Sequence, residues 1–322
     1  MTVERVGKAP VTLSQTGRAA LVAVTCLAAV GCGAIRTVAI KSVADTLSTG
    51  SGDVFTRDND PLLVRDAVPF GLKTFESLLE SVPRYVPLLT ATCANFTQYA
   101  YAFVQADIDG LDPTDYEAIT AYEERALNLY LRARGYCARG LEERQAGAVR
   151  ELRLDPDRAL RWAKPTDVPL LYWSGASLGS AISLGLGRPD LVADLPMVRA
   201  LMARALQLDE GFSNGAIHGV MIELDARVEW GGSAALARKH FERAVELSKG
   251  RDPGPYVALA TSVSKPERNR TEFVDLLEKA QAIKPEDNPS NQLVILITQQ
   301  RARRLLDRVD DLFPQTDSRR LQ

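Results

Sequence analysis

The chain is poor in the residues that most metal and catalytic sites require. Its 322 residues include only two histidines, His218 and His240, which argues against a metal site built from several histidines. It contains no glycine-rich phosphate loop, no nucleophile elbow, no zinc-ligand spacing and no His-Glu-x-x-His motif. We therefore expect a protein that is not an enzyme and that holds no metal and no cofactor.

An excess of either charge is also missing. The 39 basic and 41 acidic residues give a formal net charge of -2, without the basic footprint of a nucleic-acid-binding protein. The composition, 46% apolar and 25% charged, is that of an ordinary globular protein. Neighbouring acids do not suggest acid–base chemistry either, because Glu223 and Asp225 lie two positions apart and face different sides of a helix. We expect a folded protein with no nucleic-acid partner.

Residues 1–31 are predicted to be an export signal. Basic residues precede the apolar run Ala19–Val30, whose twelve residues are fewer than the roughly 20 that span a bilayer but suit a signal-peptide core. The run ends in Ala-Val-Gly-Cys, which resembles a bacterial lipobox, with Ala29 where leucine is usual. We interpret Cys32 as the acylated residue of a lipoprotein. The alternative is a buried N-terminal helix in which Cys32 is an ordinary thiol.

The segment 32–58 is predicted to be a lipid-anchored tether. Gly33, not aspartate, follows the cysteine, and in enterobacterial-type sorting this favours the outer membrane. We expect the protein at the inner leaflet of that membrane, facing the periplasm. Asp60 suits the N-cap of a first helix. We therefore place the folded body at 59–313 and a polar tail at 314–322.

A helical pattern recurs within the body. Arg204–Leu208 and Arg243–Leu247 both read basic, alanine, aliphatic, polar, aliphatic, with apolar residues three and seven positions before the alanine. Such residues share one helical face, and the pattern is typical of the second helix of a tetratricopeptide (TPR) pair. Anchors of this kind are Leu78, Ala126, Ala205, Ala244 and Ala280. The last two spacings approach the TPR period of roughly 34, so we predict an all-α, TPR-like solenoid of antiparallel helix pairs with additional helices.

A predicted helix at 86–106 is aromatic on nearly every side. Phe96, Gln98, Tyr99 and Tyr101 lie within it. Core packing is one interpretation, because a helix that is apolar all round is usually buried in a bundle. The other is that these residues line a cavity and offer rings and one amide to a mostly apolar ligand.

Two further helices carry candidate residues. Tyr172 and Trp173 begin a helix rich in small residues, which we expect Asp167 to cap, and they could face a pocket. His218 lies on an otherwise apolar helix, where a hydrogen-bonded core position competes with a role at a ligand. The candidate cavity-lining residues are Phe96, Gln98, Tyr99, Tyr101, Tyr172, Trp173 and His218.

Two cysteines belong to the folded body, Cys93 and Cys137. They could pair in an oxidising periplasm, or they could be two separately buried thiols. The sequence does not place their Cα atoms within bridging distance, so both alternatives stay open.

Several segments, taken together, resemble one family. The lipobox, the stretch 57–69 and the aromatic run 96–103 resemble the T component of TPR-protein-associated TRAP transporters, the TatT family. So do 167–173, 215–218 and 240–244. The resemblance extends from about residue 58 to residue 313.

The resemblance implies a TPR-like periplasmic lipoprotein that assembles as a homotrimer, with a central cavity or pore in each subunit. It implies a role in the uptake of hydrophobic ligands, organic acids among them, by a TRAP transport system. The implied partner is the periplasmic substrate-binding protein of that system, the P component. The alternative is a TPR scaffold lipoprotein for envelope assembly, with a solid core and no ligand.

Overall fold

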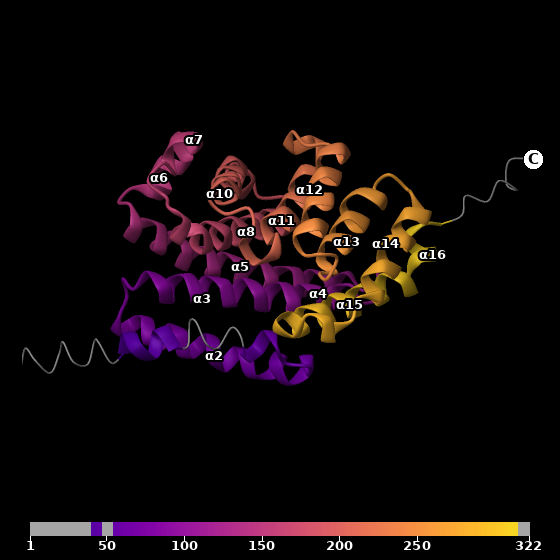
Figure 1. Cartoon of the computed structure of the whole chain (residues 1–322), viewed down its shortest axis with the longest axis horizontal. Helices are drawn as coiled ribbons and strands as arrows, with labels where there is room; N and C mark the ends of the chain where they lie inside the picture. Colours follow the sequence, from indigo (N-terminus) through magenta and orange to yellow (C-terminus); the bar gives the residue numbers. More distant parts are fainter. Residues whose placement is uncertain (1–39, 47–53, 315–322) are drawn as a thin grey trace, which may run out of the picture.

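The computed structural model describes residues 40–46 and 54–314 (Figure 1). The predicted signal peptide and Cys32 therefore lie outside the described residues. The described residues form helices and turns and contain no strand, so the prediction of an all-α protein is confirmed. No helix in these two ranges is long and apolar enough to cross a membrane.

Helices follow one another along the whole body. Those of the first half are α2 (Pro61–Ser81), α3 (Val86–Tyr99), the π-helix η1 (Ala100–Gln105), α4 (Ala106–Ile108), α5 (Tyr116–Arg144), α6 (Ala148–Leu154), α7 (Pro156–Ala159), η2 (Pro165–Asp167) and α8 (Val168–Leu184). Those of the second half are α9 (Pro189–Val192), α10 (Leu195–Leu208), η3 (Phe212–Asn214), α11 (Ala216–Asp225), η4 (Val228–Trp230), α12 (Ala234–Leu247), α13 (Gly254–Leu259), the π-helix η5 (Ala260–Ser264), α14 (Arg270–Ala282), η6 (Pro285–Asp287), η7 (Pro289–Asn291), α15 (Gln292–Asp307) and α16 (Val309–Leu312).

Helix starts follow the capping residues in some places and depart from them in others. The side chain of Asp60 accepts hydrogen bonds from the backbone N–H groups of Leu62 and Leu63, as expected of an N-cap. Asp167 does not cap α8, contrary to our prediction. Its carboxylate instead accepts the backbone N–H of Lys164 at 2.9 Å and the Nε of Arg144 at 2.6 Å. These two partners hold it in the turn before the helix.

The segment 190–208 is not one continuous helix. It forms the short α9 and then α10, which begins at Leu195. Asp194 lies at the break, is 4% exposed, and pairs with Arg134 at 2.5 Å and Arg153 at 3.0 Å. A buried carboxylate needs such partners, and both come from segments distant in the sequence.

The aromatic run is not one regular helix. Tyr99 ends α3, and the next six residues form η1. Hydrogen bonds in a π-helix reach one residue further than in an α-helix, so the side chains that follow no longer keep the α-helical period. Tyr99 is 9% exposed, whereas Tyr101, on another side, is 44% exposed.

The helices pack in a closed circuit. Successive contacts run from α2 through α3, α5, α8, α10, α11, α12, α13 and α14 to α15. Helix α15 returns to contact α2, and it lies beside α4 in Figure 1. Arg301 of α15 donates to Asp109 at 2.8 Å, and Arg304 donates to the carbonyl of Ala106 at 2.8 Å. These polar contacts therefore join α15 to α4 and the residue that follows it.

Two large apolar clusters share helix α11. Ile217 and Leu224 belong to the cluster built mainly by α2–α10, and Ile222 belongs to the cluster built by α12–α16. The scaffold alanines predicted from the sequence are buried: Ala205 and Ala280 are 0% exposed and Ala244 is 1% exposed. Their burial agrees with the expected close approach of neighbouring helices, while the assignment to TPR units stays a prediction.

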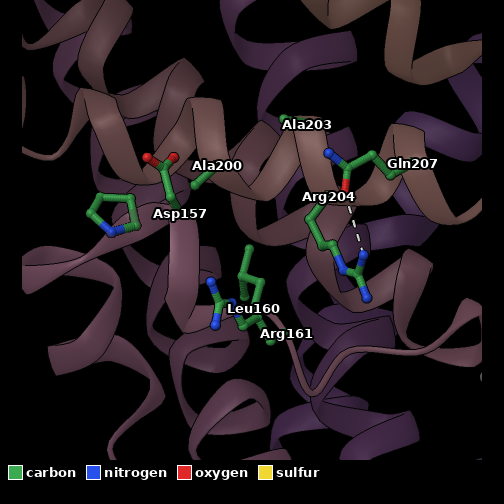
Figure 2. Close-up of a pocket in the computed structure, with 8 residues that line it drawn as sticks. Asp157, Leu160, Arg161, Ala200, Ala203, Arg204 and Gln207 are labelled. Carbon is green, nitrogen blue, oxygen red and sulfur yellow. Dashed lines mark hydrogen bonds between the residues drawn. The ribbon is translucent and has the colours of Figure 1, made fainter.

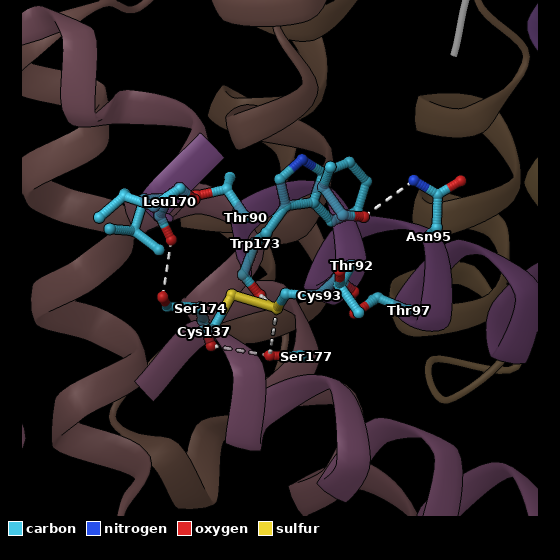
Figure 3. The surroundings of a disulfide bond; sticks show 12 residues. Thr90, Thr92, Cys93, Asn95, Thr97, Cys137, Leu170, Trp173, Ser174 and Ser177 are labelled. Carbon is cyan, nitrogen blue, oxygen red and sulfur yellow. Dashed lines mark hydrogen bonds between the residues drawn. A yellow bond between two sulfur atoms is a disulfide. The ribbon is translucent and has the colours of Figure 1, made fainter. Parts of the chain in front are cut away.

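A disulfide joins Cys93 of α3 to Cys137 of α5, with the two Cα atoms 5.5 Å apart (Figure 3). This result decides between the two alternatives that the sequence left open. Ser177 of α8 lies against the bond, its Oγ 3.8 Å from the Sγ of Cys93. The disulfide therefore lies where α3, α5 and α8 meet.

We expect reduction of this disulfide to lower the free energy of unfolding by about 2–4 kcal/mol, because the bond closes a long loop in the unfolded chain. Denaturant melts with and without reductant, checked by a free-thiol assay, measure the change. A variant with alanine at both Cys93 and Cys137 is the control, since reductant should not shift its midpoint. An unchanged midpoint in the fully reduced native chain would contradict the expectation.

Replacing Ala205 with leucine should destabilise the fold by about 1–3 kcal/mol, because its Cβ is buried and a larger side chain overpacks the contact between helices. Ala203 on the same helix is exposed, so Ala203→Leu serves as the matched control and should change stability little. Thermal or urea melts compare the two. Equal midpoints for both variants would refute the scaffold role of Ala205.

Candidate functional site

The seven candidate residues do not form one surface. Phe96, Tyr99 and His218 are 2%, 9% and 4% exposed, so these three side chains are packed among others, and a role for them at a ligand stays a prediction. Gln98 and Tyr101 are exposed, and Tyr172 and Trp173 are half-buried. Only these last four present side-chain surface.

The buried aromatic residues of α3 serve packing. The ring of Phe96 stacks on Tyr136 of α5 with centroids 5.9 Å apart, and the guanidinium of Arg132 lies over it at 5.0 Å. Tyr99 packs against Phe103 with ring centroids 5.7 Å apart. For these residues the interpretation as core packing describes the structure.

Tyr172 and Trp173 form an aromatic group at the start of α8. Their rings meet edge to face with centroids 4.8 Å apart, and the ring of Tyr172 also packs on Phe212 at 5.2 Å. Phe212 belongs to η3, so this group connects α8 to the turn before α11. Because Tyr172 remains half-buried, part of its surface is still accessible.

Tyr101 is held by an arginine from the far end of the chain. Nη1 of Arg301 donates to its hydroxyl at 3.0 Å, and the same guanidinium donates through Nε to Asp109 at 2.8 Å. Burial opposes the charge on Arg301, but its interactions with Tyr101, Asp109 and Glu223 outweigh it and raise the pKa of Arg301. The guanidinium therefore stays charged.

Tyr101 is at once accessible and desolvated. Burial raises the pKa of its hydroxyl, although 44% of the residue is exposed. The same holds for Tyr172, whose pKa is raised by burial and by the negative charges of Asp252 and Glu223. A side chain with both properties lies on a surface that solvent reaches but that protein surrounds.

Two carboxyl groups share this environment. Glu223 of α11 is exposed, yet burial raises its pKa against the opposing charges of Arg301 and Arg227. Burial also raises the pKa of Asp252, which is half-buried just before α13. We name this set the inner-wall cluster, and its members are Tyr101, Tyr172, Glu223, Asp252 and Arg301.

Sequence reasoning found the two tyrosines of the inner-wall cluster and missed its charged members. Glu223 was considered only as a partner for Asp225, and the structure confirms that these two face different surroundings, since Asp225 is 5% exposed. One available signal was that Glu223 is an acid within the otherwise apolar stretch 216–224. Arg301 gave no local signal, because its partners lie about 200 residues away.

A groove of about 280 Å³ lies elsewhere, between α7 and α10 (Figure 2). None of the seven candidate residues lines it. Its lining residues are Pro156, Asp157, Leu160, Arg161, Ala200, Ala203, Arg204 and Gln207. Arg204 donates to the carbonyl of Ala163 at 2.8 Å. Over 40–46 and 54–314, neither Arg161 nor Arg204 has an acidic partner.

In the described part of the chain, no group of three or more histidine, cysteine or acidic side chains could hold a metal ion. The polar groups of the inner-wall cluster are suited to contacting a ligand through hydrogen bonds and ring faces.

The family model described as TRAP transporter T-component matches residues 57–313. The chain belongs to this family. An uncharacterized protein of Treponema pallidum (strain Nichols) is 30% identical over 311 residues, which cover 90% of this chain and 95% of that protein. The resemblance seen in the sequence is thus confirmed. This T-component belongs to a transport system of the cell envelope, and no catalytic family is indicated.

Proposed function

We propose that this T-component binds the P component, the periplasmic substrate-binding protein of a TRAP transport system, and conducts or presents a hydrophobic small ligand. Membership in the T-component family supports the role in transport. In this proposal residues 1–31 are a signal peptide, 32–58 a tether anchored through Cys32, 59–313 a TPR-like domain and 314–322 a polar tail. Homotrimers and attachment to the inner leaflet of the outer membrane belong to the same proposal.

The observation that carries the ligand role is the combination of access and desolvation at the inner-wall cluster. Its members come from η1, α8, α11, α15 and the turn before α13, which are distant parts of the closed circuit of helices. Ring faces accompanied by a few polar groups suit a mostly apolar ligand that also carries a polar end. We therefore place the ligand path along these residues.

A second candidate is a scaffold for envelope assembly that binds proteins and no ligand. The groove between α7 and α10 favours it, because Arg161 and Arg204 lack acidic partners in the described ranges and could receive an acidic segment of a partner. Under this alternative the inner-wall cluster would contact only water.

We expect Tyr101→Ala and Tyr172→Ala to lower the amount of small molecule that co-purifies with the chain by about tenfold, since each removes ring surface worth about 1.4 kcal/mol or more. Native mass spectrometry of the complex isolated from its own cells measures this amount. Tyr116 is 75% exposed outside the cluster, so Tyr116→Ala is the control. Melting curves confirm that all three variants are folded.

The same isolation distinguishes the two functions. Recovery of a TRAP substrate-binding protein supports the proposal. Recovery of an envelope-assembly machine, without that protein and without any small molecule, would overturn it in favour of the scaffold.

We expect labelled palmitate to enter the native chain and Cys32→Ala to abolish the labelling, because the lipobox cysteine is the acylated residue. Cys26 lies within the same predicted signal, so Cys26→Ala should keep the label and serves as the control. Persistent labelling of Cys32→Ala would exclude the proposed anchor.

A further inference from the structure

The two histidines of the chain lie against each other. Nδ1 of His218 on α11 is 2.7 Å from Nδ1 of His240 on α12. The outer nitrogens face carboxylates: Nε2 of His218 is 3.2 Å from Glu210, and Nε2 of His240 is 3.3 Å from Asp225. The four side chains form one linear chain, with an acid at each end.

The number of protons that these four side chains need for their three contacts can be counted. An ionised carboxylate only accepts hydrogen bonds, so each Nε2 must carry a hydrogen, and the central pair of nitrogens needs one more. Two neutral imidazoles supply two hydrogens for these three contacts. All three contacts are made only when the pair carries one additional proton. A second additional proton would place two N–H groups face to face.

Both terminal acids remain ionised where histidine titrates. The hydrogen bond from Arg243 is the main cause that lowers the pKa of Glu210 to about 2; burial opposes it, and the hydrogen bond from His218 adds to it. Burial opposes ionisation of Asp225, but His240 and Arg199 outweigh it and lower its pKa.

Other charged groups around the pair are accounted for. Arg243 of α12 also binds Glu246, and Arg227 before η4 binds Glu229. Helix α13 packs on α11 and α12 but has no charged residue, and the ring of its Tyr256 lies against Phe241.

The histidine pair lies where α11 contacts helices of both apolar clusters. Helix α11 contributes to both apolar clusters, so its contacts link the two halves of the body. Asp225 joins three helices, because it also accepts from Arg199 of α10 at 2.7 Å, while His240 reaches it from α12. Arg199 in addition donates to the carbonyl of Trp230 at 2.7 Å.

We infer that His218 and His240 hold one shared proton that fastens α11 to α12, and that this joint between the two apolar clusters loosens in acid. The inference does not depend on the proposed role in transport. It rests on the three contacts among Glu210, His218, His240 and Asp225 and on the number of hydrogens that these contacts require.

The effect of the second proton on the stability of the fold has a defined direction. Burial and the positive charge of His240 lower the pKa of His218. A histidine in the unfolded chain has a pKa of about 6.5, so below this pH the unfolded chain binds more protons and stability falls as the pH decreases. The lost stability corresponds to the second proton, which the folded pair resists.

Nuclear magnetic resonance of the imidazole nitrogens tests the shared proton directly. The full chain is labelled with ¹⁵N and purified without a histidine tag, so His218 and His240 are the only imidazoles observed. We expect two titration steps more than about one pH unit apart, as interacting sites require. Two superimposed, independent single-site curves in the native chain would overturn the inference, whatever the behaviour of any variant.

Variants test the joint. In His218→Gln and His240→Gln the remaining imidazole should titrate in one step, and the fall in melting temperature between pH 7 and pH 5 should shrink. Arg238 on α12 forms ion pairs with Glu267 and Glu272 and with neither histidine, so Arg238→Gln should keep the native pH dependence. The same pH dependence in the histidine variants as in the native chain would show that the pair does not control the joint.

Discussion

The return of α15 to the start of the body is the contact on which the rest of the structure depends. Apolar packing contributes to this contact, because Leu293 of α15 belongs to the same buried cluster as Val64 of α2. It is non-directional, and Arg301 adds directed contacts, because one guanidinium binds both Asp109 and Tyr101. Arg308 adds a hydrogen bond to the carbonyl of Asp109 at 3.1 Å.

Much of the fold was predictable from the sequence, because helix periodicity and buried alanines are local signals. The buried Ala205 and Ala280 are examples. The break at Asp194 and the π-helix after Tyr99 were not predictable. The carboxylate of Asp194 at the break pairs with arginines from α5 and α6. These arginines are distant in the sequence, so no local pattern predicts the pairing.

The candidate site was predicted in part for the same reason. An aromatic run indicates a helix that contains candidate site residues, but it does not predict which of their rings are buried. Phe96 serves the packing of α3 on α5, whereas Tyr101 is presented by η1. The charged members of the inner-wall cluster acquire their meaning only when helices far apart in the sequence meet. His218 likewise read as a lone histidine until the structure placed His240 beside it.

The closure at Arg301 and the joint at the histidine pair lie at different places in the circuit of helices, and they differ in chemistry. A guanidinium stays charged throughout the physiological range, whereas an imidazole does not. By the inference drawn above, acid loosens the contact of α11 with α12 and leaves the contacts of Arg301 in place. The two apolar clusters then stay connected through α15, which contributes Leu293 to one of them and Ala302 to the other.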